Sequence, residues 1–354
     1  ADDIAVGQPG SEQVLIFFGP FTADLTDADA DVVISVRSGG IFEGVGTELV
    51  AARFDSDDRD DLVIGTGLSD GWAGGVVVLY GGATATAIQL HHNNPSDMGD
   101  AVGYFMRPDD GRIQSPGWHL TNLGRTQGSA DDNDDLAIGF YDEKELAILR
   151  GINMQPMTGL VEVSPDLVYQ DLIDEGPDPD TFGASTYFGT ASCGIPDANN
   201  DGAGDIAIGA WATGDNDGRV VLVDGNLSGT QTVDGATLIA EILPETGVEF
   251  LGTELACDGD VDGDGIMDLV VAARDTTMDV MILLVWYGDD LPLGSVNTSS
   301  AHYMVASPFT LVAPINLSRP AELSWVGDVN NAGLEDLCWA DYVDDGSFQL
   351  LWDE

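Results

Sequence analysis

The sequence predicts an all-β fold, a β-propeller of about six four-stranded blades, with seven blades as the alternative. Three observations carry this prediction. A five-residue signature, an aspartate followed by a short apolar run, recurs six times at intervals of 58, 74, 70, 63 and 68 residues. A second apolar run follows each signature after a short turn, which is the pattern of a β-hairpin. No segment shows convincing helical spacing of apolar residues, so each repeat is expected to hold four short strands.

The first two strand types can be placed from the repeated sequences. The signatures lie at residues 3–7, 61–65, 135–139, 205–209, 268–272 and 336–340. Their hairpin partners lie at 14–19, 76–81, 146–151, 220–225, 281–286 and 348–352. An earlier strand is indicated by Gly-Thr-Glu-Leu at 46–49 and 252–255, with a looser copy at 188–191. A fourth, more variable strand is expected after each hairpin, for example at 31–36 and 85–90.

The repeats predict one domain, residues 1–354, rather than several. One blade cannot bury both of its faces, so six blades must stack around a channel and share a core. A parallel β-solenoid is the rival architecture, but its repeats of about nine residues are far shorter than these. The expected units are approximately 1–40, 41–110, 111–180, 181–242, 243–310 and 311–354.

Both terminal units are expected to be incomplete. The first lacks its opening strand, and the last stops after its third strand. Pairing of the two termini would close the ring and satisfy otherwise open sheet edges. Self-assembly is the alternative, in which a strand from another chain fills the gap.

The loop at 260–268 has the clearest chemistry in the chain. Its positions 1, 3, 5 and 9 are Asp260, Asp262, Asp264 and Asp268, and a glycine at position 6 allows a tight turn. Carboxylate oxygens at alternate positions of such a loop are ligands for Ca²⁺, with the Ile266 carbonyl as a fifth ligand. The apolar run that follows is typical of a strand, so the loop differs from the calcium loop that is flanked by helices.

The pattern Asp-x-Asp-x-Asp-Gly-x-x-Asp-Leu-x-Val, followed by a strand bounded by glycine, resembles the FG-GAP repeat of integrin α-subunit β-propellers and their bacterial and archaeal relatives. The resemblance covers essentially the whole chain. It implies a propeller that binds several Ca²⁺ ions in loops between the first two strands of its blades. It implies little about the partner, because this repeat occurs in proteins with different functions.

The resemblance also implies ligands in the other loops. The fourth loop offers Asp197, Asn199, Asp201 and Asp205. The sixth offers Asp328, Asn330 and Asp336, with alanine at position 5. The third is the weakest internal loop and keeps only Asp131 and Asp135. For any one loop, the alternative is a solvated turn rich in Asp and Asn that caps a strand.

The second loop is ambiguous in its alignment. It carries Asp55, Asp57 and Asp61, but Arg53 falls at position 1 if the alignment has no gap. A deletion relative to the fifth loop would instead give Asp55 the role of position 1.

The charge of the chain excludes several functions. Eleven basic and 62 acidic residues give a net charge of −51, and the only lysine is Lys144. Nucleic acid is therefore excluded as a partner, because a phosphate-binding surface needs the opposite sign. No apolar run of about 18 residues is present, so membrane insertion is not expected. Six Ca²⁺ ions would still leave −39, and the remaining acidic surface suggests a high-salt or marine setting.

The three cysteines do not form a recognisable framework. Cys193, Cys257 and Cys338 are too few for a disulfide scaffold and too widely spaced for a zinc site. We expect them to be small buried strand residues. One disulfide with a free third thiol is the alternative.

No convincing catalytic motif is present, and an enzyme is not expected. The Gly-x-Ser-x-Gly match at 67–71 precedes a strand rather than a helix, so it indicates a hairpin turn. The favoured function is a secreted or cell-surface calcium-stabilised module with a structural or adhesive role, binding a protein or glycan and contributing to an extracellular assembly. The alternative is a polysaccharide-acting enzyme, or an accessory domain of one, with its site at the mouth of the channel.

Overall fold

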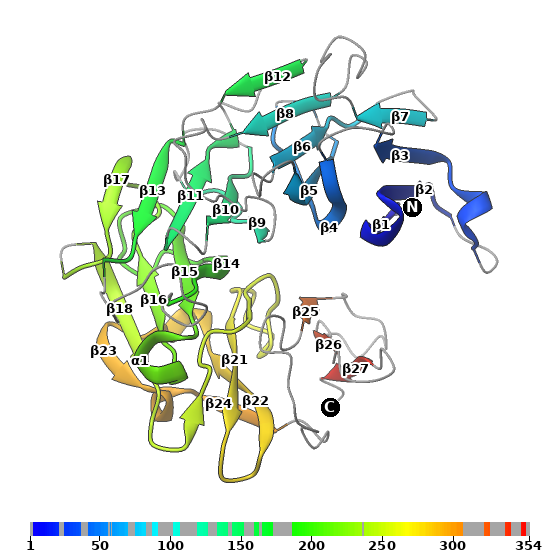
Figure 1. Ribbon diagram of the computed structural model, residues 1–354. Coiled ribbons are helices and arrows are strands. Elements are labelled where there is room, and N and C mark those ends of the chain that lie inside the picture. The colour runs from blue at the N-terminus through cyan, green and yellow to red at the C-terminus, as the bar shows by residue number, and fades with distance from the viewer. Residues whose placement is uncertain are drawn as a thin grey trace. The chain divides into compact units, whose positions relative to one another are not determined.

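The computed structural model (Figure 1) shows that the chain is built from β-sheets and that it forms two compact units. One unit comprises residues 1–124, 132–143 and 147–168, and the other comprises 125–131, 144–146 and 169–354. The residues described by the structure are 3–20, 25–36, 42–55, 57, 59–69, 75–82, 87–90, 102–106, 119–126, 133–140, 144–151, 159–162, 165–172, 186–235, 237–306, 322–325, 337–340 and 348–351.

The first unit contains two complete sheets. The first has the order β1-β2-β3-β7, with strands Ile4–Gln8, Gln13–Phe17, Val32–Val36 and Ala87–Leu90. The second has the order β12-β8-β6-β5-β4, with strands Gly159–Glu162, Val102–Met106, Gly75–Leu79, Asp61–Ser69 and Phe42–Ala52. The 3-10 turns η1 and η2 span Pro9–Ser11 and Asp27–Asp29.

A third sheet has the order β17-β13-β11-β10-β9. Its strands are Gly229–Thr232, Leu167–Gln170, Glu145–Leu149, Leu136–Phe140 and Leu120–Asn122.

The second unit contains three further sheets. The fourth sheet has the order β14-β15-β16-β18-β23, with strands Phe188–Ile195, Asp205–Ala210, Val220–Val223, Leu238–Leu243 and Gly294–Asn297. The fifth has the order β19-β21-β22-β24, with β20 also paired to β21. Its strands are Val248–Glu249, Leu269–Asp275, Val280–Trp286 and Tyr303–Ala306, and β20 is Leu255–Ala256. The sixth is β25-β26-β27, with strands Glu322–Trp325, Leu337–Ala340 and Phe348–Leu351.

Helical turns in the second unit are short. The one α-helical element among the described residues, α1, spans only Thr213–Asn216, and the 3-10 turns η6 and η7 span Gly288–Asp290 and Thr298–Ser300. The all-β class predicted from the sequence is therefore confirmed. The number of blades, their boundaries and the closure of a ring stay predictions.

The predicted hairpins form as expected. Each signature strand pairs antiparallel with the next apolar run, for example β1 with β2, β5 with β6, β15 with β16 and β21 with β22. Each sheet forms around this hairpin because both strands carry continuous apolar runs. The signature residues Ile206, Ile208 and Val271, for example, are fully buried.

The fourth strand differs from the expectation in one repeat, and the difference reveals a rule. Residues 85–90 were predicted to complete their own sheet, but β7 instead pairs in parallel with β3 of the preceding sheet. The fourth strand of that repeat is β8, which pairs with β6. The prediction for 31–36 is correct, since β3 pairs with β2. A short run such as Ala87–Leu90 specifies a strand but not the sheet it joins.

The same exchange recurs along the chain. Strands β12 and β23 also pair in parallel with the fourth strands β8 and β18 of the sheets before their own. Strand β17 likewise lies at the outer edge beside β13. We call β7, β12, β17 and β23 the crossing strands. The second, third, fourth and fifth repeats therefore each extend the sheet of the repeat that precedes them.

Adjacent repeats approach closely at pairs of glycines. A Cβ atom on Gly7 of β1 would lie 2.0 Å from the carbonyl oxygen of Gly46 in β4, and one on Gly209 would lie 2.2 Å from that of Gly252. Gly46 and Gly252 have φ values of +83° and +86°, which favour glycine. The repeated Gly-Thr-Glu-Leu sequence thus begins with the glycine that contacts the signature strand of the preceding repeat.

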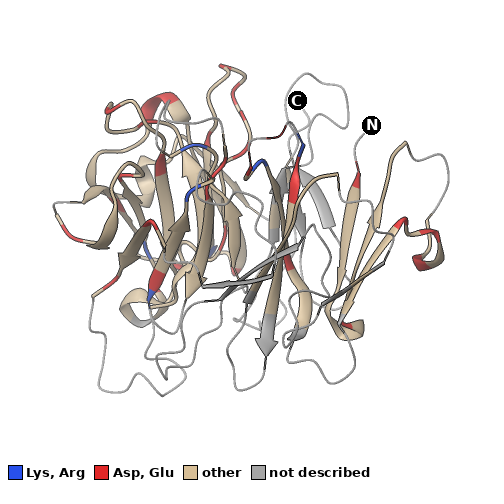
Figure 2. Cartoon of the chain, turned by 90° about the horizontal axis from the view of Figure 1, so that it is seen from above, with Lys and Arg blue, Asp and Glu red and all other residues tan. Residues whose placement is uncertain are grey.

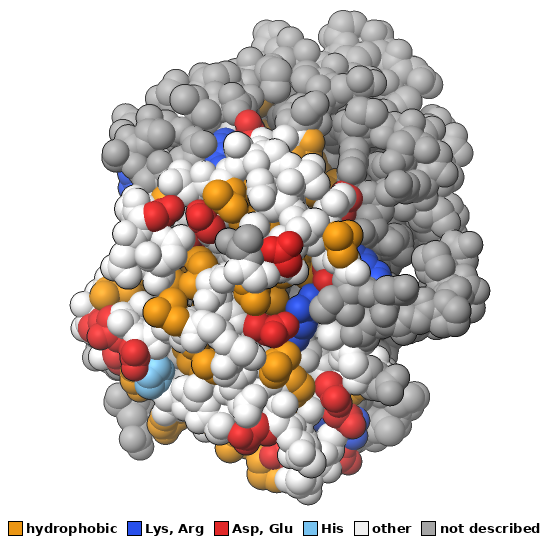
Figure 3. Space-filling view, turned by 90° about the vertical axis from the view of Figure 1, so that its left-hand side faces the viewer, with side chains coloured by type: hydrophobic (Ala, Val, Ile, Leu, Met, Phe, Trp, Pro, Cys, Tyr) orange, Lys and Arg blue, Asp and Glu red, His pale blue; other side chains and the backbone are white. Residues whose placement is uncertain are grey.

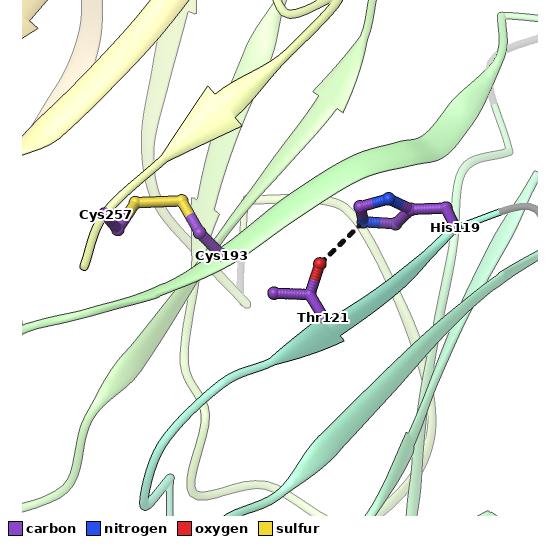
Figure 4. Close-up of a disulfide and its surroundings, with 4 residues drawn as sticks. All are labelled: His119, Thr121, Cys193 and Cys257. Atoms are coloured by element: carbon purple, nitrogen blue, oxygen red, sulfur yellow. Dashed lines mark hydrogen bonds between the residues drawn. A yellow bond between two sulfur atoms is a disulfide. The ribbon is translucent and has the colours of Figure 1, made fainter. Parts of the chain in front are cut away.

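The cysteine prediction is wrong for two of the three residues. Cys193 of β14 and Cys257, directly after β20, form a disulfide (Figure 4) within a buried cluster that also contains Leu222 and Trp286. Both side chains are buried, as expected, but they are bonded to each other. The alternative of one disulfide therefore holds, and the sequence missed it because 64 residues separate the two cysteines. The side chain of Cys338 lies outside the described part of the structure.

Candidate metal centres

The fifth loop, between β20 and β21, brings three carboxylates together. Ligand oxygens of Asp260, Asp262 and Asp268 all lie within 4.8 Å of one another. Oxygens that bind one Ca²⁺ ion at 2.3–2.6 Å lie at most about 5 Å apart, so the spacing of these three fits a single ion. This cluster is the one group of three or more such side chains found in the described residues.

Backbone amides fix the shape of this loop. Asp260 accepts hydrogen bonds from the N–H groups of Gly263, Asp264 and Gly265, at 2.7, 3.1 and 2.7 Å. Gly263 and Gly265 have φ values of +81° and +88°, which explains why glycine occupies both positions. The predicted ligands Asp264 and Ile266 are also in this turn, where Oδ1 of Asp264 accepts the Ile266 N–H at 2.7 Å.

The fourth loop, between β14 and β15, has the same bonding pattern. In both loops position 5 donates its N–H to positions 1 and 3, as Asp201 does to Asp197 and Asn199, each at 2.9 Å. Position 6 donates to position 1, as Gly202 does to Asp197 at 2.8 Å. Position 7 donates to position 5, as Ala203 does to Asp201 at 2.9 Å. The two loops are therefore equivalent bond for bond in these contacts.

The last aspartate of each loop joins two segments of its repeat. One oxygen accepts the N–H of position 2: Asp268 bonds Val261 at 2.7 Å and Asp205 bonds Ala198 at 2.9 Å. The other oxygen accepts the N–H of the glycine that follows the next strand. The five such pairs are Asp3–Gly19, Asp61–Gly81, Asp135–Gly151, Asp205–Gly225 and Asp268–Gly288, at 2.8–3.3 Å.

These glycines are required by a close approach of the backbone. A Cβ on Gly288 would lie 2.2 Å from the carbonyl oxygen of Met267, at position 8 of the fifth loop. A Cβ on Gly225 would lie 2.2 Å from that of Gly204, at the same position of the fourth loop. The glycine that ends the second apolar run therefore lets its N–H reach the aspartate.

The structure settles the alignment of the second loop. Phe54 donates its N–H to Asp61 at 3.0 Å, as position 2 does in the fourth and fifth loops. Arg59 donates to Asp57, and Asp57 donates to Asp55, both at 2.8 Å. Asp55 and Asp57 are therefore positions 3 and 5, and no residue is deleted. Arg53 stands at position 1, where the fifth loop has Asp260.

In the third loop, a buried arginine side chain lies beside the last aspartate. Its last aspartate, Asp135, is buried with a guanidinium nitrogen of Arg150 at 3.9 Å. Arg150 is itself buried, and it occupies the place of Tyr80, Asp224 and Tyr287 in other repeats, just before the glycine. A fixed positive charge at this aspartate disfavours a metal ion in the same loop. Sequence reasoning missed this role, although the scarcity of basic residues was a usable signal.

Burial raises the pKa of the last aspartate in the second, fourth and fifth loops. It raises the pKa of Asp61 and of Asp205 to about 6, although the hydrogen bonds from the backbone oppose this shift. Burial also raises the pKa of Asp268, with further contributions from the charges of Asp262 and Asp260. A cation bound beside such a carboxylate would offset the cost of keeping it ionised.

The remaining predicted ligands lie outside the described residues. These are Asp131 of the third loop and Asp328, Asn330 and Asp336 of the sixth. The chain has 62 acidic and 11 basic residues. Figure 2 marks many of the acidic positions on turns and loops.

Comparison with known proteins gives one partial similarity. The chain is 31% identical to integrin alpha-10 of Homo sapiens over 87 residues, which are 25% of this chain and 7% of that protein. No family model matches the chain. The similarity is consistent with the predicted integrin-like β-propeller, and the chain spans only a small part of that protein's length.

The structure also bears on location. None of its described helices has the length and apolar character needed to cross a membrane. The Cys193–Cys257 disulfide is of the kind that persists in oxidising compartments.

Proposed function

We propose that this chain is an extracellular or cell-surface propeller module whose loops bind Ca²⁺, and that it serves as a structural or adhesive element that binds a protein or glycan. The proposal rests on one observation above all. The Asp260, Asp262 and Asp268 carboxylates come together within the fifth loop, and the fourth loop repeats the backbone contacts around them.

Calcium binding would stabilise the fold through the last aspartate. Asp268 connects the loop to Gly288 after β22, so an ion held by Asp268 also holds the loop against the end of the hairpin. The surrounding acidic residues repel one another in the absence of a cation. Millimolar Ca²⁺ outside cells is sufficient to fill even weak sites of this kind.

The extracellular location is supported by the disulfide and by the similarity to part of integrin alpha-10. The proposed role is one of binding and scaffolding without catalysis. A panel of polysaccharide substrates tests the enzymatic alternative, and turnover of any of them would contradict a purely structural role.

The decisive experiment compares thermal melts in excess EGTA and in about 1 mM Ca²⁺, a concentration found outside cells. We expect the ion to raise the melting temperature by several degrees, because only the folded loops assemble the site. The Asp262→Asn variant should lose part of this increase. Equal melting temperatures with and without Ca²⁺ would refute the proposal.

A further inference from the structure

The turn that follows each hairpin brings the chain back to the loop that precedes the hairpin. In the fourth and fifth repeats this turn begins with Gly225 and Gly288, whose N–H groups bond the last aspartate of the loop. Both glycines also lie against the carbonyl group at position 8 of the loop. The residue after each glycine, Asn226 or Asp289, is therefore held beside the candidate ion site.

Asn226 contacts the fourth loop directly. Its side-chain nitrogen donates to Oδ2 of Asp201, the predicted ligand at position 5, at 3.3 Å. Its backbone N–H is bonded to the Asp224 carboxylate at 2.8 Å, which fixes the turn. A flip of the side-chain amide exchanges its nitrogen and oxygen. Asn226 can therefore present an oxygen at the same place beside the loop.

Asp289 occupies the equivalent position in the fifth repeat. Desolvation raises the pKa of Asp262, the predicted ligand at position 3, and the charges of Asp264, Asp260 and Asp289 raise it further. The Asp289 side chain is exposed, and no described residue donates a hydrogen bond to it. Asp289 therefore adds negative charge to the loop from outside the loop sequence.

His302 holds the turn that carries Asp289. Its ring stacks on Tyr287 with centroids 4.6 Å apart, and its Nδ1 accepts the Tyr287 N–H at 3.0 Å. Its Nε2 lies 3.2 Å from the carboxylate of Asp290, whose backbone N–H bonds the Tyr287 carbonyl at 3.1 Å. Asp290 is therefore engaged by His302, whereas its neighbour Asp289 acts on Asp262.

The first three repeats have no oxygen-bearing side chain at this position. The residue after the glycine is Pro20, Gly82 or Ile152. In the second repeat, Nη1 of Arg59 fills the space that a Cβ atom on Gly82 would occupy. Among the first five repeats, the two with such a side chain are also the two whose loops keep an Asp or Asn at positions 1, 3, 5 and 9.

We propose that the residue after the hairpin glycine supplies an additional oxygen to the ion site, and that Asp289 thereby strengthens Ca²⁺ binding by the fifth loop more than Asn226 does in the fourth, a role that rests on the proposed calcium function. Ca²⁺ takes at least about six oxygen ligands, and the charge of its ligands sets the affinity. The fifth loop itself offers four carboxylates and the Ile266 carbonyl. A further donor from the turn would bring the ligand set to the number that Ca²⁺ requires.

A local contact must be separated from general attraction of cations to an acidic protein. The net charge is −51, and acidic side chains are exposed at several places on the face seen in Figure 3. At an ionic strength of about 1 M the screening length falls to about 3 Å. An effect on Ca²⁺ affinity that persists in such salt therefore comes from a group beside the ion.

The test follows hydrogen exchange of the loop amides of the full chain as Ca²⁺ is added in about 1 M potassium chloride. Residues 261–266 report on the fifth loop and residues 198–203 on the fourth, so each loop gives its own midpoint Ca²⁺ concentration. Asp289→Asn should raise the midpoint of the fifth loop about fivefold or more and leave that of the fourth unchanged. Asn226→Asp should lower the midpoint of the fourth loop by a similar factor and leave that of the fifth unchanged.

Asp290→Asn is the matched control. It removes the same charge from the same turn, but from a side chain that contacts His302. It should leave both midpoints unchanged. Thermal melts of Asp289→Asn in EGTA should match those of the wild type, which distinguishes a role at the ion from a role in the fold.

Equal fifth-loop midpoints for the wild type and Asp289→Asn would overturn the proposal, as would equal shifts for Asp289→Asn and Asp290→Asn. An unchanged fourth-loop midpoint in Asn226→Asp would also overturn it. If Ca²⁺ slowed exchange in neither loop of the wild type, the proposed calcium function itself would fail. The two failures are distinguishable, because the first is seen only when the wild-type loops respond to Ca²⁺.

Discussion

Asp268 and Gly288 are joined by a 2.8 Å hydrogen bond from the glycine N–H to the carboxylate, across a full β-hairpin. The same carboxylate accepts the Val261 N–H at 2.7 Å. A proposed metal ligand is therefore also a structural connection between the loop and the strands, and the two roles can be separated by mutation.

The first prediction compares two aspartates of the fifth loop in EGTA. Asp268→Asn should lower the free energy of unfolding by about 1–3 kcal/mol, because one buried N–H then faces an amide donor. Asp262→Asn should change it by less than about 0.5 kcal/mol, since Asp262 is exposed. Urea unfolding monitored by tryptophan fluorescence measures both. Equal effects of the two substitutions would contradict the assigned structural role.

The second prediction concerns the glycine after the hairpin. Gly225→Ala should destabilise the protein by about 1–3 kcal/mol, because the new methyl group would lie 2.2 Å from the carbonyl oxygen of Gly204. The control is Gly235→Ala, since a Cβ at Gly235 meets nothing within 4 Å. Thermal melts of the two variants provide the comparison. A tolerated Gly225→Ala would show that the loop backbone can move away.

The third prediction concerns the buried cation of the third loop. Arg150→Gln should lower the free energy of unfolding by up to about 3 kcal/mol, because it leaves the buried Asp135 carboxylate without its ion partner. Arg53→Gln, at exposed position 1 of the second loop, should have little effect. Calcium binding by the Arg150→Gln variant in isothermal titration would show that the Arg150 guanidinium takes the place of a metal ion in the third loop.

The fourth prediction concerns the Cys193–Cys257 disulfide. Its reduction should lower the free energy of unfolding by about 4 kcal/mol, the chain-entropy value for a loop of this length. Urea unfolding with and without dithiothreitol measures the change. The double variant Cys193→Ala and Cys257→Ala is the control, because dithiothreitol should no longer affect its stability.

The fifth prediction concerns pH. Desolvation lowers the pKa of His119 to about 4, and its Nε2 lies 3.0 Å from the Thr121 hydroxyl (Figure 4). As the pH falls, His119 binds a proton near pH 6.5 in the unfolded chain but only near pH 4 in the folded chain. This contribution to stability is therefore complete above pH 6.5 and is lost as the pH falls towards 4.

The measurement compares wild type with His119→Asn from pH 7 to pH 4.5 in EGTA. Wild type should lose stability relative to the variant as the pH falls. Asp61 and Asp205 act in the opposite direction, because their raised pKa values favour the protonated folded state at low pH, but they contribute equally to both proteins. A difference that does not change with pH would mean that His119 titrates normally.

The sequence predicts the hairpins and the turn of the fifth loop well because both depend on local patterns. The signature strands and the turn of the fifth loop follow from apolar runs and from glycines with positive φ. The sheet that Ala87–Leu90 joins could not be predicted in this way, since the pairing of β7 with β3 is decided by contacts between repeats.

Two features of the candidate site also escaped sequence reasoning. The Gly288 N–H that holds Asp268 lies 20 residues away, and only the folded hairpin brings them together. The cation at Asp135 comes from Arg150, which occupies a position that carries tyrosine or aspartate in other repeats. Neither contact leaves a periodic pattern that a reader of the sequence could detect.

The crossing strands have a consequence for how this protein can be made and divided. Because β7, β12 and β23 each complete a sheet that began one repeat earlier, the first, second and fourth sheets are not complete on the ribosome until part of the next repeat has been synthesised. If the chain were divided between two repeats, the last sheet of the upstream fragment would lack its outer strand. The downstream fragment would carry that crossing strand without the sheet it pairs with. Shortened versions should therefore be designed to end after a crossing strand, within the following repeat, rather than at the end of a sequence unit.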